Sequence, residues 1–152
     1  MSALLPSGSD LSGQLAEGFT RVSSQLRRTS ARRLAPLGLT YAQARLLRTI
    51  AAASRPLRMS ELAAGLGIVP RSATTTVEAL ETAGFVARLP DPDDRRSVLV
   101  ALTPEARRAV AHIQSARCDA ADEVFAALDT SERATLLAFL DRVDAPITEA
   151  TR

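Results

Sequence analysis

Apolar residues near the start of the chain recur every three or four positions, the spacing of an amphipathic helix. Asp10 is a suitable N-cap for such a helix. Its apolar side would consist of Leu11, Leu15, Phe19, Val22 and Leu26. Pro36 and Gly38 belong to the residue types that end helices. The pattern therefore predicts a first helix that begins at Asp10 and ends near Pro36.

A second helix is predicted to begin after Thr40, because Thr40 and Gln43 have the spacing of a capping box. The segment SRPLR, residues 54–58, ends this helix. Its buried side would hold Ala44, Leu47 and Ile50.

Two shorter helices are predicted next. Ser60 is expected to cap the third helix, ELAAGLG, which ends at Gly67. Pro70 suits the first turn of a fourth helix, which would run to about Ala83.

Two Val- and Leu-rich runs, FVARL at 85–89 and SVLVAL at 97–102, flank a loop of Pro, Asp and Arg residues. This pattern is typical of an antiparallel hairpin. Thr103, with Pro and Glu directly after it, is expected to begin a long fifth helix that runs to about Leu128. A last helix is expected over about residues 131–143. The predicted fold class is mainly α (α+β).

Two short helices joined by a tight turn at Gly67, with a hairpin directly after them, have the order of a winged helix-turn-helix. In such a unit the second helix enters the major groove of DNA. About 3.6 residues per turn place Ala73, Val77 and Leu80 of the fourth helix toward the core. Arg can bind guanine through two hydrogen bonds, and Ser or Thr can contact bases or phosphates. The candidate DNA-contacting residues of the two helices are Ser60, Arg71, Ser72, Thr74 and Thr75. The alternative is an ordinary amphipathic helix with a polar outer side.

The tip of a hairpin that lies along DNA should carry cations, because a narrow minor groove attracts arginine. Arg95 and Arg96 are predicted at this tip, and Arg88 at the base of the incoming strand. These three arginines are therefore candidate DNA contacts.

The aspartates of the same loop repel phosphate, so their predicted role is internal. Asp91 and Asp93 suit a turn through bonds from side chain to backbone. Asp94 is expected to pair with an arginine and orient it. The alternative is a solvated charged turn, in which such pairs contribute little.

The loop and the start of the fifth helix also carry a motif, D-x-R-x5-L-T, formed by Asp94, Arg96, Leu102 and Thr103. Together with the segments LGLTYAQARLLRTIA, MSELAAGLGI and PRSATTTVEALETAGFVAR, this motif resembles the MarR family of bacterial transcription regulators. The resemblance covers residues 37–108 closely and the flanking helices only by length and position.

The resemblance implies a homodimer that binds a pseudo-palindromic operator as a repressor and is released by a small phenolic or aromatic effector, or by oxidation. It places Arg96 in the minor groove with Asp94 fixing it, and Arg71, Ser72 and Thr75 at the major groove. It also divides the chain into three regions. Residues 37–103 would form a winged helix-turn-helix DNA-binding domain. Residues 10–36 and 104–148 would form a helical dimerisation region, and residues 1–9 and 149–152 would be tails.

The C-terminal segment is more apolar than a solvated helix tolerates. Leu136–Leu140 lies in an apolar stripe with Val124, Phe125, Leu128, Val143 and Ile147. A core shared across a two-fold axis would bury this stripe; packing within one protomer is the alternative.

Charge is distributed unevenly along the chain. All 19 basic residues are arginines, and the net charge is +2. Through Arg108 there are 15 arginines against 9 acidic residues, and after it 4 against 8. A basic N-terminal part and an acidic C-terminal part favour a polyanion-binding region joined to a region with another role. A chance distribution of charge is the alternative.

Few residues are available for catalysis, redox chemistry or metal binding. Cys118 is the single cysteine, so no intrachain disulfide can form, and an isolated Cys such as this is usually a small buried hydrophobe. His112 is the single histidine, so we expect no metal and no cofactor. We find no nucleophile–base pair and no Gly-rich phosphate loop, and we expect no enzyme.

No stretch has the length of a membrane span or the pattern of a secretory signal, so we expect a cytoplasmic protein that does not bind membranes. Two alternatives to a ligand-responsive repressor remain. One is an oxidation sensor that acts through Cys118, and the other is a winged helix that binds only proteins. Steep salt dependence would distinguish DNA binding from the latter.

Overall fold

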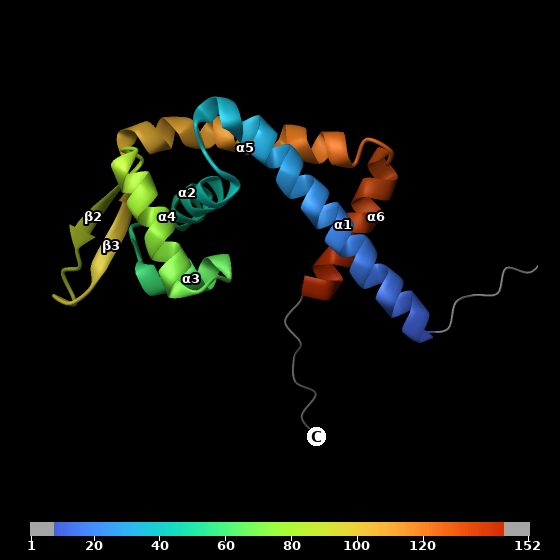
Figure 1. The fold of residues 1–152 in the computed structure, drawn as a ribbon, viewed down its shortest axis with the longest axis horizontal. Coiled ribbons are helices and arrows are strands. Elements are labelled where there is room, and N and C mark those ends of the chain that lie inside the picture. Colours follow the sequence, from blue (N-terminus) through green and yellow to red (C-terminus); the bar gives the residue numbers. More distant parts are fainter. Residues whose placement is uncertain (1–7, 145–152) are drawn as a thin grey trace, which may run out of the picture.

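The computed structural model describes residues 8–144 of the 152-residue chain. Ile147 and most of the two predicted tails lie outside these residues. The described part is mainly helical with a small sheet, as predicted, and Figure 1 shows its elements. In chain order they are α1 (Gly8–Leu34), η1 (Ala35–Leu37), α2 (Tyr41–Ala53), β1 (Leu57–Arg58), α3 (Met59–Leu66), α4 (Pro70–Thr82), β2 (Val86–Pro90), β3 (Val98–Leu102), α5 (Pro104–Val124) and α6 (Thr130–Asp144).

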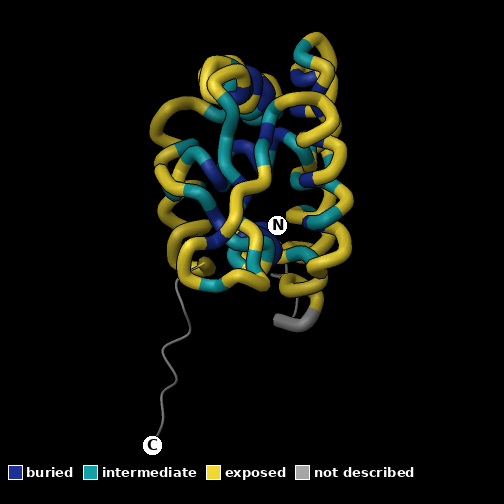
Figure 2. The backbone as a smooth tube through the Cα atoms, turned by 90° about the vertical axis from the view of Figure 1, so that its left-hand side faces the viewer, coloured by how far each residue is buried: buried dark blue, intermediate teal, exposed yellow. Residues whose placement is uncertain are grey.

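Helix α5 connects two parts of the molecule (Figure 1). The sheet and helices α2, α3 and α4 lie at one of its ends, and α1 and α6 lie toward the other. Figure 2 shows the buried backbone positions inside the first part, with exposed positions around them. The largest fully buried side chains of the core are Leu46, Leu47, Leu62, Val77, Leu80, Val100 and Ile113. No helix of the described part is long and apolar enough to cross a membrane.

The beginning of α2 confirms the predicted capping box. The Thr40 hydroxyl accepts a hydrogen bond from the backbone N–H of Gln43 at 3.2 Å. The Gln43 side chain accepts one from the backbone N–H of Thr40 at 2.8 Å. Ala44, Leu47 and Ile50 are buried as expected, because the helix turns them toward the same core.

The prediction that Ser60 caps α3 is wrong. Helix α3 begins at Met59, and its N-cap is Arg58, whose backbone N–H donates to the Glu61 carboxylate at 2.8 Å. Ser60 is therefore an exposed residue of the first turn. The helix begins earlier because Leu57 and Arg58 pair with a strand that is distant in sequence, and the chain turns into the helix directly after them.

We expect the Glu61 carboxylate to make the stability of the protein depend on acid pH. The Arg55 guanidinium at 2.6 Å, followed by the Arg58 backbone N–H, lowers the pKa of Glu61 from 4.5 to about 2. A lowered pKa gives stability that is present above the ordinary value and is lost as the pH falls toward the folded value. The free energy of unfolding of the wild type should therefore exceed that of Glu61→Gln above pH 4.5, and the difference should shrink toward about pH 2.

Urea unfolding of both proteins at a series of pH values, followed by circular dichroism, measures this difference. A difference that stays constant down to the acid limit would show that Glu61 does not carry the effect.

The sheet contains one strand more than the predicted two-stranded wing. Its order is β1-β3-β2, and all pairs are antiparallel. In the hairpin, Val86 pairs with Leu102 and Pro90 with Val98. On the other edge of β3, Leu57 pairs with Val100. A two-residue strand is too short to produce an alternating pattern, which is why the sequence does not reveal β1.

The end of α5 comes earlier than predicted, at Val124 instead of about Leu128. The Arg133 side chain donates to the backbone carbonyls of Leu128 and Phe125 at 3.2 and 3.0 Å, and so holds the chain in a turn. Asp129 then accepts hydrogen bonds from the first backbone N–H groups of α6, including that of Ser131 at 2.8 Å. These contacts fix the turn between α5 and α6.

Candidate nucleic-acid interface

Helix α4 presents a polar outer side, as predicted. Ala73, Val77 and Leu80 are fully buried, whereas Arg71 and Ser72 are exposed. The tight turn that precedes α4 begins at Gly67, the left-handed C-cap of α3, whose φ is 63°. This positive φ favours glycine, because a side chain is strained there. Burial of the three apolar residues therefore orients the outer side of α4 toward solvent.

The threonines of α4 are hydrogen-bonded to their own helix. The hydroxyl of Thr74 donates to the carbonyl of Pro70 at 3.1 Å, and that of Thr75 donates to the carbonyl of Arg71 at 3.2 Å. Since a hydroxyl donates only one hydrogen, its oxygen stays available as an acceptor. Thr75 is exposed and can accept from a partner outside the protein, whereas Thr74 is half-buried.

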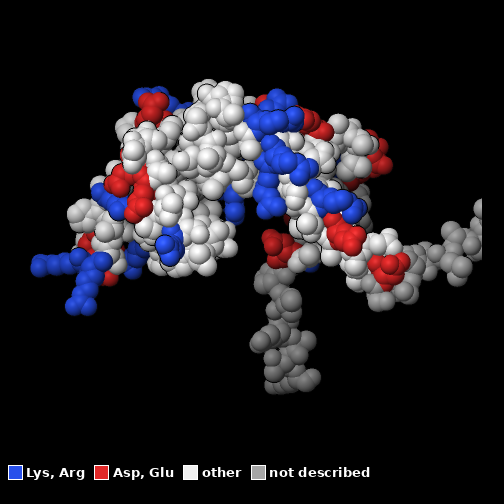
Figure 3. Space-filling view, in the orientation of Figure 1, with Lys and Arg blue, Asp and Glu red and all other residues white. Residues whose placement is uncertain are grey.

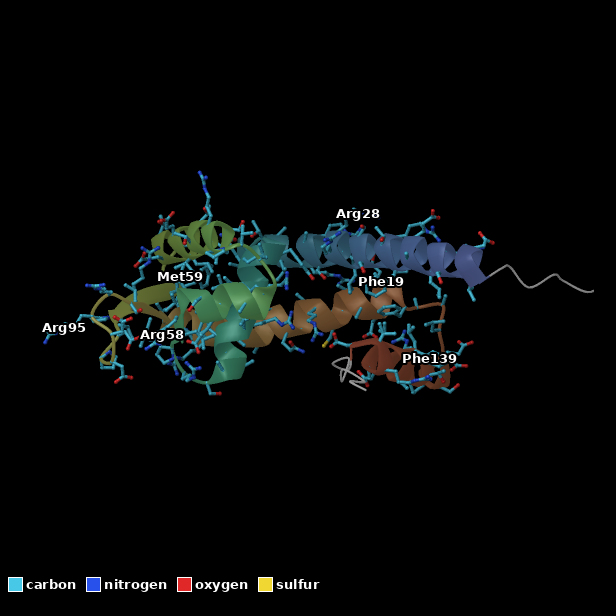
Figure 4. All side chains as sticks on the ribbon, turned by 90° about the horizontal axis from the view of Figure 1, so that it is seen from below. Phe19, Arg28, Arg58, Met59, Arg95 and Phe139 are labelled. Atoms are coloured by element: carbon cyan, nitrogen blue, oxygen red, sulfur yellow. The ribbon has the colours of Figure 1, made fainter. Side chains whose placement is uncertain are left out.

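Arg95 and Arg96 lie exposed at the tip of the hairpin. Figure 3 shows arginines projecting from this tip, and Figure 4 places Arg95 at its far end. Among the described residues, neither guanidinium has a hydrogen-bond or acidic partner. The same holds for Arg71 on α4 within the described range. Two separate elements thus present uncompensated cations.

The aspartates of the hairpin differ from the prediction in one respect. Asp91 accepts from the backbone N–H of Asp93 at 2.9 Å, as expected for a turn. Asp94 accepts from the Ser97 hydroxyl at 2.7 Å and from the backbone N–H of Arg96 at 3.0 Å, and these contacts lower the pKa of Asp94. The expected pair between Asp94 and an arginine side chain is absent from the described structure. Asp94 instead fixes the backbone at Arg96.

The carboxylate that does hold an arginine is that of Asp91, whose side chain is only 2% exposed. The Nε of Arg58 donates to it at 2.6 Å, and this contact is the main cause of the lowered pKa of Asp91. Figure 4 shows Arg58 beside the hairpin. Sequence reasoning missed Arg58, because only the non-local strand β1 brings it to a residue 33 positions away.

Arg88 is bound to α4 instead of extending toward the tip. Its guanidinium lies 3.3 Å from Glu81 and 3.8 Å from Glu78. Because two carboxylates compensate its charge, Arg88 joins β2 to the C-terminal half of α4. Its predicted contact with DNA would require breaking these pairs. Ser60 is exposed in the first turn of α3, and so lies on neither α4 nor the hairpin.

Cys118 and His112 both lie exposed on α5. The expectation that Cys118 is a buried hydrophobe is therefore wrong. Its helix packs against α1 along another side, where Ile113, Ala116 and Ala120 are buried. Within residues 8–144, no group of three or more His, Cys, Asp or Glu side chains is arranged to hold a metal ion.

The segment that contains the helix-turn-helix and most of the hairpin is similar to a known protein family. Residues 39–98 match the model of the MarR family. The chain carries a MarR-family domain. This confirms the resemblance seen in the sequence over the segment from α2 to the start of β3.

MarR-family crystal structures also resemble the chain over nearly its whole length. MarR from E. coli in its apo form is 28% identical, with 93% of this chain and 98% of that chain covered and a TM-score of 0.77. A mutant of E. coli MarR, complexed with operator DNA, is 28% identical at a TM-score of 0.79, with coverage of 91% and 99%. A MarR-family regulator from Rhodococcus sp. RHA1 is 25% identical at a TM-score of 0.79, with coverage of 93% and 98%. No curated protein is significantly similar in sequence to the chain.

Proposed function

We propose that this chain is a sequence-specific DNA-binding transcription regulator. The observation that carries the proposal is the set of uncompensated arginines on two elements, Arg71 on α4 and Arg95 and Arg96 at the hairpin tip. A helix with exposed donors suits the major groove, and an arginine-bearing hairpin suits the minor groove. The likeness to MarR in complex with operator DNA supports the same function.

The regulator would act as a homodimer on a pseudo-palindromic operator. Exposed apolar residues support this proposal. Leu11, Leu15 and Phe19 of α1 are exposed, and so are residues of α6, namely Leu137, Phe139, Leu140 and Val143. Both helices lie toward the end of α5 away from the hairpin (Figure 1). A second copy would bury these residues and present two α4 helices, about one helical turn of DNA apart or a small multiple.

Repression relieved by a small phenolic or aromatic effector is the finer part of the proposal. The junction of α1, α2 and α5 contains a cavity of about 40 Å³, beside Tyr41, Arg45 and Arg117. Its volume gives room for a few water molecules, so a phenolic effector would have to open it. Such an opening would separate α1 from α2 and so change the distance between the two recognition helices.

We expect Arg71→Ala to lower discrimination at particular base pairs by roughly 1–3 kcal/mol, because it removes a base contact. Arg96→Ala should weaken binding more uniformly and reduce the salt slope by about one unit, because it removes a phosphate-proximal charge. Fluorescence anisotropy on DNA selected from a random pool, at several salt concentrations, measures both quantities.

Arg108→Ala is the matched control, since Arg108 is an exposed arginine of α5 that pairs with Glu105. It removes the same charge from another part of the surface and should bind like the wild type. If Arg71→Ala and Arg96→Ala also bind like the wild type, the interface is assigned to the wrong residues.

A further inference from the structure

The outer side of α4 carries a carboxylate as well as an arginine. Glu78 follows Arg71 by seven residues, about two turns of the helix, so both side chains leave α4 on the same side. Thr75 lies between them on that side. All three residues are exposed, whereas Val77, directly before Glu78, is fully buried. The outer stripe of α4, Arg71, Thr75 and Glu78, therefore presents a cation, a hydroxyl and a carboxylate in that order.

The spacing of this outer stripe suits the edges of successive base pairs. Side chains at positions i, i+4 and i+7 of a helix face one way, and a recognition helix presents such a side to the major groove. Seven residues advance the helix by about 10 Å, which is close to the rise of about three base pairs of DNA. A helix in the groove would thus hold Glu78 about three base pairs from the base that Arg71 contacts.

The carboxylate of Glu78 is open to partners outside the protein. Among the described residues its ionic partner is Arg88, whose nitrogen lies 3.8 Å away, beyond the length of a hydrogen bond. Arg88 lies closer to Glu81, at 3.3 Å. The side chain of Glu78 is 59% exposed. Its oxygens therefore remain available to accept hydrogen bonds.

The neighbouring Arg88 makes a carboxylate tolerable beside DNA. Phosphates repel a negative charge, and a cation next to that charge offsets part of the repulsion. Arg88 lies within ion-pair distance of both Glu78 and Glu81. The pair with Glu81 keeps the guanidinium at the C-terminal half of α4, where it compensates Glu78 without using the Glu78 oxygens for hydrogen bonds.

A carboxylate on this side of α4 has few compatible partners on DNA. In the major groove, guanine presents two acceptors and thymine presents an acceptor and a methyl group. Donors are the amino groups of cytosine and adenine. Adenine also presents the acceptor N7 beside its amino group, and a carboxylate has no proton to donate to N7. Cytosine is therefore the base that best matches a carboxylate.

We propose that Glu78 is a specificity-determining residue that accepts a hydrogen bond from the 4-amino group of a cytosine in each operator half-site. This cytosine lies about three base pairs from the base pair that Arg71 contacts. The carboxylate also repels the acceptor oxygens of guanine and thymine, and so excludes them from that position. The inference rests on the proposed function, because it requires α4 in the major groove.

The test is selection of the operator of the full chain from a random DNA pool, followed by fluorescence anisotropy on duplexes with each base pair at the selected position. We expect the wild type to prefer cytosine there by about tenfold. Glu78→Gln should shift the preference to adenine, because the amide of Gln donates to N7 and accepts from the amino group. Glu78→Ala should abolish the preference.

Glu81→Gln is the matched control. It removes the same charge from the same helix and takes away the closer partner of Arg88. Its side chain leaves α4 about 60° around the helix from that of Glu78, outside the outer stripe. Glu81→Gln should therefore leave the base preference unchanged. Arg71→Ala should alter discrimination only at its own position, about three base pairs away.

A cytosine analogue without the 4-amino group tests the contact itself. An operator with 2-pyrimidinone in place of the selected cytosine should bind the wild type about tenfold more weakly. Glu78→Ala should bind the two operators alike, because the carboxylate that distinguishes them is gone. Losses that add instead would mean that the carboxylate and the amino group act separately.

The inference is wrong if the selected operator has no cytosine preference about three base pairs from the Arg71 position, or if both Glu78 variants keep the wild-type preferences. A weaker affinity of both variants for every sequence, with unchanged preferences, also contradicts it, since that loss would be structural. A chain that selects no DNA contradicts the proposed function together with this inference. A chain that selects an operator whose base preferences do not depend on Glu78 contradicts only this inference.

Discussion

Leu15→Glu combined with Phe19→Glu is expected to convert the proposed dimer to a monomer and to weaken operator binding by about 10²–10⁴-fold. Leu15 and Phe19 lie one turn apart on α1 and are 66% and 64% exposed in the protomer. Burying them against a second copy removes apolar area from water, and carboxylates in that interface would be unpaired. The loss of affinity follows because one DNA-binding domain no longer holds the other near its half-site.

Light scattering gives the mass of the variant, and fluorescence anisotropy gives its affinity for the operator. The protomer should keep its fold, because neither residue belongs to its core. Ala16→Glu combined with Thr20→Glu is the matched control. It adds the same charge one position along the helix, at two exposed residues that face another side of α1. A Leu15/Phe19 variant that stays dimeric would place the dimer interface on other elements.

Leu80→Ala should reduce the free energy of unfolding by about 2–5 kcal/mol. The Leu80 side chain is 0% exposed and anchors α4 to the core. Removing three of its carbons loses transfer free energy and leaves a cavity that the surrounding helices fill only in part. Since a domain of this kind has roughly 5–15 kcal/mol of stability, the loss is a large share of the whole.

Urea unfolding at a fixed protein concentration measures this effect, because the stability of a dimer depends on concentration. Leu89→Ala is the control, since Leu89 on β2 is the same residue type but 41% exposed. It should cost clearly less than Leu80→Ala. Equal losses would mean that α4 is not held by burial of Leu80.

Elements that depend on neighbouring residues could be predicted from the sequence. The capping box of α2 needs only Thr40 and Gln43, and the buried side of α4 follows from helical spacing. The hairpin follows from two Val- and Leu-rich runs around a turn. In each case the residues that decide the structure lie within a few positions of one another.

Features that depend on distant residues could not be predicted. Strand β1 exists because Leu57 pairs with Val100, and this pairing moves the start of α3 from Ser60 to Met59. The same strand brings Arg58 to Asp91. At the candidate site, the exposed arginines of α4 and of the hairpin tip were found because their positions follow from local turns and helical spacing. Arg58 and the compensated state of Arg88 became visible only with the tertiary contacts.

The bond between Arg58 and Asp91 has a consequence for how an operator would be recognised. It ties the turn of the hairpin to the N-cap residue of α3, 33 positions earlier, and so restrains the base of the wing in the protein without DNA. A segment that is already restrained loses less conformational entropy on binding. The restrained wing also keeps a set distance from α4. The proposed contacts of α4 with the major groove and of the hairpin with the minor groove would therefore be spaced by the protein. Such a protein would therefore select operators by the shape of the double helix between those two contacts as well as by the bases that it touches.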